Sequence, residues 1–149
     1  MTTFSGPSSR KECRLQRKTD SHNPADWLFF ARSDLDGIRS LAAAEVGHEM
    51  ARSKLAEVLE KLMKAELIRT GWGLEKTHDL QRLAKELRAR NSDLFGPIRP
   101  LVDEFAEVYF TNRYPGFDVE DPDWPALRTA LREVEALAAV IEGRLKPAS

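Results

Sequence analysis

The chain has 149 residues, a length that suits one domain with a single hydrophobic core. Its hydrophobic content of 42%, charged content of 32% and net charge of −1 are ordinary for a globular protein, and they exclude a surface that is basic over its whole extent. It has no apolar leader and no run of about 18 apolar residues, and the lone Cys13 cannot form an internal disulfide, so we expect a cytoplasmic protein without a membrane span.

The first 23 residues are polar and basic. Five Lys or Arg residues oppose two acidic residues there, and Phe4 and Leu15 are among its few large apolar side chains. Because such a segment buries little apolar surface, it cannot offset the entropy cost of becoming ordered. We therefore predict a disordered basic tail over residues 1–23, either solvated or serving as a short RNA-contacting arm, and a helical domain over residues 24–146.

The first predicted helix begins with Asn23 as N-cap and Pro24 in its first turn. Its inner face is a set of apolar residues at helical spacing, namely Trp27, Phe30, Ala31, Ile38 and Leu41. Asp34 falls inside this apolar stripe, where a carboxylate needs a partner or an opening. Two interpretations follow for Asp34: an internal salt bridge to a neighbouring helix, or a role in a site.

A second helix is predicted from about Gly47 to Arg69 and ends at Gly71. Its apolar face is broad enough to touch more than one helix and consists of Ala51, Leu55, Val58, Leu59, Leu62 and Met63. Glu57 with Lys61 and Glu60 with Lys64 have the spacing of stabilising i,i+4 ion pairs. The wide face, together with Trp72 and Trp124 as exposed aromatics, predicts a homodimer.

The third helix is predicted to open at Thr77, with Thr77 as N-cap and His78 in the first turn. Its inner face would consist of Leu80, Leu83, Ala84 and Leu87. A histidine at this place either caps and packs, or it accepts a proton or contacts a base.

After a break at Asn91–Pro97, a fourth helix is predicted to carry Leu101, Val102, Phe105, Val108 and Tyr109 and to stop at Tyr114-Pro115, so that Arg113 projects from its C-terminus. The acidic stretch 118–123 is interpreted as a solvated loop. Asp123 caps a last helix whose core stripe is Leu127, Leu131, Val134, Ala138, Ile141 and Leu145. The sequence thus predicts an all-α, up-and-down bundle of about five helices.

Several classes of site are excluded by motif. The chain has no Gly-rich phosphate loop, no Gly-x-Ser-x-Gly elbow and no His-Glu-x-x-His. One cysteine and three scattered histidines do not supply a structural zinc site. We expect neither a metal nor a cofactor.

Four stretches, in this order and spacing, resemble the HEPN family of small helical bundles associated with nucleotide and RNA chemistry. They are Trp27 with Ala31, Asp34 and Leu35; Glu60-Lys61 with Lys64-Ala65; Thr77-His78-Asp79-Leu80; and Arg113-Tyr114-Pro115. The resemblance covers about residues 25–146 and implies an HEPN-like fold. One departure is that Ser53–Glu57 stands where the family often has an aromatic-His-x-Gln-Gln run.

Many HEPN members are metal-independent ribonucleases that use Arg, four to six residues, then His, late in the bundle. Only Arg17 and His22 fit that spacing here, and they lie in the basic tail. Three hypotheses follow: a nucleotide- or RNA-binding HEPN protein that partners a small nucleotidyltransferase in a toxin-antitoxin-like module, a ribonuclease with an atypical site, or a structural interaction bundle. The candidate ligand-binding residues, expected on one rim of the bundle, are Asp34, Lys61, Lys64, His78, Arg113 and Tyr114.

Overall fold

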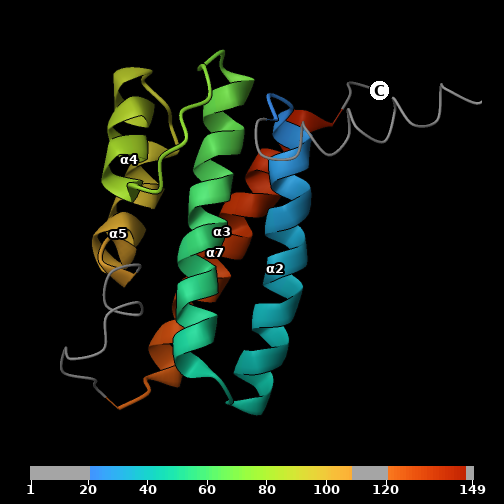
Figure 1. The fold of residues 1–149 in the computed structure, drawn as a ribbon, viewed down its shortest axis with the longest axis vertical. Helices are drawn as coiled ribbons and strands as arrows, with labels where there is room; N and C mark the ends of the chain where they lie inside the picture. The colour runs from blue at the N-terminus through green and yellow to red at the C-terminus, as the bar shows by residue number, and fades with distance from the viewer. Residues whose placement is uncertain (1–20, 109–120, 147–149) are drawn as a thin grey trace, which may run out of the picture.

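The computed structural model describes residues 21–108 and 121–146, and no strand occurs in these ranges. The helices are α2 (Pro24–Ala44), α3 (His48–Arg69), α4 (Leu80–Ala89), α5 (Phe95–Phe105) and α7 (Trp124–Leu145). The central helix is α3: α2 and α7 pack against it and against each other, and α4 and α5 lie on its far side from α2 (Figure 1). The predicted all-α bundle is confirmed. None of the described helices is long and apolar enough to cross a bilayer.

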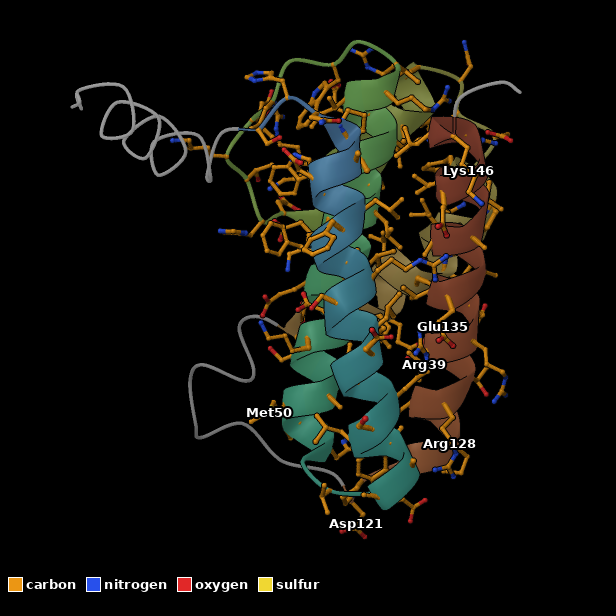
Figure 2. The ribbon with its side chains drawn as sticks, turned by 90° about the vertical axis from the view of Figure 1, so that its right-hand side faces the viewer. Arg39, Met50, Asp121, Arg128, Glu135 and Lys146 are labelled. Carbon is orange, nitrogen blue, oxygen red and sulfur yellow. The ribbon has the colours of Figure 1, made fainter. Side chains whose placement is uncertain are left out.

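Helices α2 and α7 run antiparallel and are tied together by ion pairs along their length. Figure 2 shows Arg39 and Glu135 facing each other across the two helices. The other two pairs, Arg32 with Glu142 at 2.5 Å and Arg128 with Glu45 at 2.8 Å, follow the same antiparallel register. Charged side chains therefore border the core on this face of the bundle.

The predicted helix starts are confirmed at three places. The Asn23 side chain accepts a hydrogen bond from the Ala25 amide at 3.0 Å, with Pro24 in the first turn of α2. The Asp123 side chain caps α7 through the Ala126 amide, also at 3.0 Å. At the start of α3, Gly47 is the N-cap with a φ of 66°, a left-handed conformation that suits glycine. Residues 1–20 of the predicted tail lie outside the described ranges.

The core draws on every described helix, and the predicted stripe of α7 is buried through Ile141. On α2 the prediction was wrong in part: the Phe30 side chain is 53% exposed, and Leu28 and Leu35 are buried instead. The buried face of α2 consists of Leu28, Ala31, Leu35, Ile38 and Ala42, which recur at helical spacing. Phe30 lies beside this face and not within it. The largest fully buried side chains are Phe105, Leu35, Ile38, Leu55, Leu59, Leu62, Met63, Leu67, Leu83, Leu87, Ile98 and Ile141.

The expected exposure of Trp72 was wrong: only 5% of this residue is exposed. The α3 helix ends in a Schellman turn, in which Gly71 has a φ of 98° and the Trp72 amide donates to the Leu67 carbonyl at 3.0 Å. This turn folds the indole back onto the core. The broad apolar face of α3 is covered by α2, α4 and α7 of the same chain, so that face no longer supports a dimer.

The third helix begins later than predicted. Asp79, not Thr77, is its N-cap and accepts hydrogen bonds from Gln81 and Arg82, so His78 precedes the helix instead of lying in its first turn. The Thr77 hydroxyl accepts a hydrogen bond from the Asp79 amide at 3.1 Å, a local turn ahead of the cap. Helix α5 ends at Phe105, before the predicted Val108. The expected end of that helix, with Tyr109 and the Tyr114-Pro115 stop, lies outside the described residues.

Candidate functional site

A buried ion pair in α3 forms the base of the candidate site. Glu60 and Lys64 lie one turn apart, with Lys64 Nζ 2.8 Å from Glu60 Oε2, and their side chains are only 8% and 4% exposed. The Lys64 ammonium also lies over the Trp27 ring of α2, 5.2 Å from its centroid. The pair therefore lies between α2 and α3, where a single unpaired charge would be costly. The predicted Glu60–Lys64 pair is confirmed, although it is buried.

His78 closes this cluster from the segment before α4. Its Nδ1 lies 3.0 Å from both Oε1 and Oε2 of Glu60, while its side chain is 65% exposed. A carboxylate at Nδ1 favours the tautomer with the proton on that nitrogen and fixes the plane of the ring. The Glu60 carboxylate thus holds an oriented imidazole at the surface.

The Asp34 carboxylate of α2 is paired with Lys61, the residue that follows Glu60 on α3. Lys61 Nζ lies 2.5 Å from Asp34 Oδ2, and both side chains are about one-fifth exposed. The expected internal salt bridge from Asp34 to a neighbouring helix is therefore observed. The predicted Glu57–Lys61 pair was wrong: Glu57 pairs with Lys54 instead, at 3.2 Å. Asp34 on α2 is a second partner within reach of Lys61, and sequence spacing alone does not reveal it.

The structure brings four of the six predicted site residues into one cluster on α2, α3 and the segment before α4. Asp34, Lys61, Lys64 and His78 belong to it, while Arg113 and Tyr114 lie outside the described residues. Lys61 and Lys64 were expected to add positive charge for a phosphate, but each is paired with a carboxylate. His78 is therefore the most exposed polar member of the cluster.

Two further members of the cluster were missed as site residues. Glu60 holds both Lys64 and His78, and Trp27 packs against the ammonium of Lys64. A signal for Glu60 existed, because Glu60 lies at helical spacing from Ala56, Met63 and Leu67 and so borders the broad apolar face of α3. That context indicates burial. In a buried i,i+4 pair, unlike a surface pair, the loss of either partner leaves a costly unpaired charge.

The chemistry of this cluster is that of an exposed imidazole oriented by a buried carboxylate. A histidine held at Nδ1 by a carboxylate can donate or accept a proton at its other ring nitrogen. The described residues contain no group of three or more His, Cys, Asp or Glu side chains arranged to hold a metal ion. The arrangement therefore suits proton transfer or hydrogen bonding to a polar ligand.

The HEPN domain family matches residues 25–144, which is most of the chain and includes the whole cluster. No curated protein and no solved structure matches this chain. The match agrees with the all-α bundle and spans the stretches around Asp34, Glu60 and His78. The chain belongs to the HEPN domain family.

Proposed function

We propose that this HEPN protein binds a nucleotide or RNA at the α2–α3 cluster, with His78 as a contact residue. The observation that carries the proposal is the Glu60–His78 pair, in which a buried carboxylate orients a largely exposed imidazole. An imidazole fixed in this way can hydrogen-bond to a base edge, a ribose hydroxyl or a phosphate. The family's association with nucleotide and RNA chemistry supports the same assignment.

Aromatic side chains beside the cluster support the binding of bases. Phe30 lies one turn after Trp27 and one turn before Asp34 on α2, and it is 53% exposed. Its ring contacts that of Phe29 edge to face, with centroids 5.6 Å apart. Exposed aromatic rings are the surfaces on which unpaired bases stack, for about 1–3 kcal/mol per base. Because Lys61 and Lys64 are already paired, base stacking and the His78 contact contribute more to the binding free energy than lysine–phosphate attraction.

We further propose that Arg113 and Tyr114 join the site.

The proposal is tested with a fluorescein-labelled, mixed-sequence single-stranded RNA of about 12 nucleotides and with labelled ATP, by fluorescence anisotropy. We expect His78→Ala and Phe30→Ser each to weaken binding by about tenfold or more, since each removes a contact worth more than about 1 kcal/mol. The control is Thr129→Ala, which alters an exposed residue of α7 that is part of neither the cluster nor the basic tail. Full-strength binding by both cluster variants, with unchanged thermal unfolding, would place any ligand elsewhere.

A second function, metal-independent RNA cleavage, is favoured by the contact at His78 Nδ1. A carboxylate that holds one ring nitrogen while the other can accept a proton is the arrangement of a general base. Such a base would take the ribose 2′-hydroxyl proton as that oxygen attacks the adjacent phosphorus. The bond from this phosphorus to the 5′-oxygen of the next nucleotide then breaks, the 5′-oxygen takes up a proton, and the products are a 2′,3′-cyclic phosphate and a 5′-hydroxyl end. The test is cleavage of the same RNA in EDTA, with His78→Ala and Glu60→Gln as variants. RNA that stays intact with the unaltered protein would restrict the site to binding.

We propose a homodimer and a small nucleotidyltransferase, in a toxin-antitoxin-like module, as the protein partners. Large apolar side chains that are exposed in the monomer support a protein contact: Phe29, Phe30, Val46, Met50 and Val140. Light scattering across a concentration series tests the dimer, and a chain that stays monomeric at high micromolar concentration refutes it. A nucleotidyltransferase gene beside this one, followed by co-purification of the two products, tests the second partner.

A further inference from the structure

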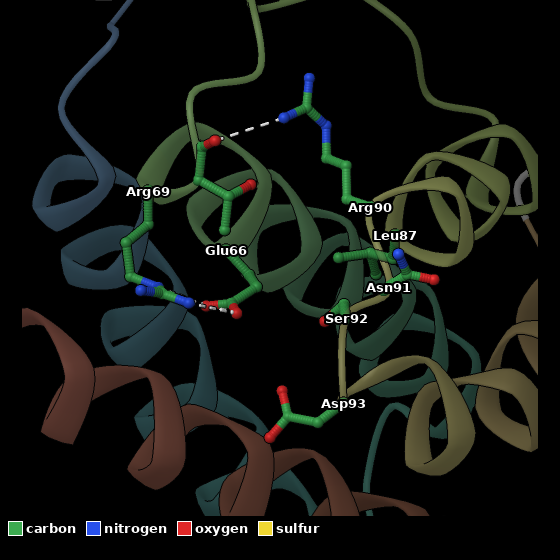
Figure 3. A pocket seen from close by; sticks show the side chains of 8 residues that line it. Glu66, Arg69, Leu87, Arg90, Asn91, Ser92 and Asp93 are labelled. Carbon is green, nitrogen blue, oxygen red and sulfur yellow. Dashed lines mark hydrogen bonds and ion pairs between the residues drawn. The ribbon is translucent and has the colours of Figure 1, made fainter.

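A polar pocket of about 310 Å³ opens between the C-terminal ends of α3 and α4. It shares no lining residue with the α2–α3 cluster. Figure 3 shows Arg69 and Glu66 on one side of it and Arg90, Asn91, Ser92 and Asp93 around the rest. Arg144 of α7 reaches the carboxylates at its base.

Both carboxylates of the pocket already have partners. Glu66 is 1% exposed and accepts hydrogen bonds from Arg69 Nε and Nη2 at 2.9 and 2.8 Å, and from Arg144 Nη1 at 2.6 Å. Arg144 Nη2 donates to Asp93 Oδ2 at 2.5 Å, and this hydrogen bond lowers the pKa of Asp93. Both carboxylates therefore already accept hydrogen bonds from guanidinium groups, Glu66 from Arg69 and Arg144 and Asp93 from Arg144.

Hydrogen-bond donors remain around the pocket after these pairs are formed. Arg90 donates through Nη1 to the Thr70 carbonyl at 3.3 Å, and its Nη2 and Nε make no hydrogen bond within the described residues. Arg69 likewise donates through Nε and Nη2 to Glu66, so its Nη1 remains as a donor for a ligand. The Ser92 hydroxyl accepts from the Leu94 amide at 3.1 Å and keeps its own hydrogen to donate. Together with Arg144, three guanidinium groups face two carboxylates, which leaves one positive charge.

The helix ends around the pocket carry partial negative charge, and the structure offsets it. The last carbonyls of α4 accept hydrogen bonds from their own turn: the Asn91 amide donates to Arg88 at 3.0 Å and the Ser92 amide donates to Leu87 at 2.9 Å. Asn91 has a φ of 57°, the left-handed conformation that this turn requires. The last carbonyls of α4 are therefore covered by their own turn, and the excess positive charge comes from Arg144, which pairs with the two acids from behind the lining and leaves donors of Arg69 and Arg90 for a ligand.

We propose that this pocket binds a small oxyanion, either inorganic phosphate or the phosphate of a phosphomonoester, between the guanidinium groups of Arg69 and Arg90. Planar guanidinium groups match the oxygens of phosphate, and charge-assisted hydrogen bonds are the strong ones. The cavity volume suits an anion of this size or a small phosphorylated metabolite. This site is independent of the α2–α3 cluster, so each can be present without the other.

The test is a titration of the full-length ¹⁵N-labelled protein with sodium phosphate and, separately, with AMP, against sodium chloride at matched ionic strength. Residue-resolved amide shifts are needed because the basic segment 1–20 can attract anions by itself. We expect the Asn91 and Ser92 amides to shift saturably with phosphate but not with chloride. Tighter saturation with AMP identifies a phosphomonoester as the ligand, whereas tighter saturation with phosphate identifies the free ion.

Arg90→Gln removes a donor on an exposed side chain, and we expect it to raise the dissociation constant about tenfold or more, the effect of one charge-assisted hydrogen bond. The matched control is Arg99→Gln, an exposed arginine of α5 outside the pocket, which should leave the titration unchanged. Shifts that fail to saturate, match the chloride series or persist in Arg90→Gln overturn the proposal.

Discussion

Replacing Lys64 by methionine tests the buried pair at the base of the α2–α3 cluster. The substitution keeps the length of the side chain but leaves the Glu60 carboxylate, only 8% exposed, without its ammonium partner at 2.8 Å. Breaking a buried pair in this way costs about 3–5 kcal/mol. The lost contact with the Trp27 ring adds about 0.5–2 kcal/mol, and the remaining contact of Glu60 with His78 offsets part of the total.

We therefore expect Lys64→Met to lower the free energy of unfolding by about 3 kcal/mol, which for a domain of this size corresponds to a fall in melting temperature of about 6–12 °C. The double variant Glu60→Leu/Lys64→Met should lie within about 1 kcal/mol of the unaltered protein, because no buried charge is then left without a partner. Urea unfolding followed by circular dichroism at 222 nm measures both values.

The matched control for this experiment is Lys54→Met on the same helix. Lys54 pairs with Glu57 at 3.2 Å, but its side chain is 46% exposed, so its loss should cost less than about 1 kcal/mol. If Lys64→Met costs no more than this control, the Glu60–Lys64 pair is not excluded from water. A double variant as unstable as the sum of its single variants would show that the two charges do not act as a pair.

Three further predictions concern the salt bridges and the start of the domain. Asp34→Asn and Lys61→Met should be non-additive by about 0.5–2 kcal/mol in a double-mutant cycle of urea unfolding, and strict additivity would contradict the 2.5 Å pair. Deletion of residues 1–23 should lower the free energy of unfolding by about 1 kcal/mol more than deletion of residues 1–20, because the longer deletion removes the Asn23 cap. Equal melting temperatures of the two shortened proteins would contradict this. The hydrogen bond from Arg32 lowers the pKa of Glu142 from 4.5, so its contribution is present above about pH 4.5 and is lost as the pH falls through the lowered pKa. The melting temperature of Glu142→Gln should therefore fall less than that of the unaltered protein between pH 5 and pH 3, and parallel curves would refute this assignment.

The helix ends that could be predicted from the sequence are those where one residue dominates the choice. Asn23 stands directly before Pro24, and Asp123 stands two residues before Pro125, so each helix has a capping side chain followed by a proline in its first turn. At the third helix, Thr77 and Asp79 are both suitable caps two residues apart, and the structure uses Asp79, the residue with the stronger N-cap preference. That shift of two residues moved His78 from the helix to the segment before it.

Contacts between helices account for the remaining differences between the predicted and the observed structure. Lys61 had an i,i+4 partner in Glu57, but Asp34 of the facing helix binds it instead. Trp72 could have been predicted to be buried, because the residue after the glycine of a Schellman turn often packs against the end of its helix. Sequence alone could not bring Asp34, Glu60 and His78 together, since their contacts depend on how α2, α3 and the segment before α4 pack.

The Glu60–Lys64 pair also bears on why the α2–α3 cluster exists. Apolar residues of similar volume would keep the bundle at least as stable, so stability alone does not account for a buried ion pair in α3. The same Glu60 carboxylate holds the imidazole of His78, and that contact is lost in Glu60→Leu/Lys64→Met. The double variant should therefore keep its fold and lose affinity for the labelled RNA by about tenfold, as His78→Ala does. A stable double variant that binds RNA at full strength would show that Glu60 does not position His78 for binding.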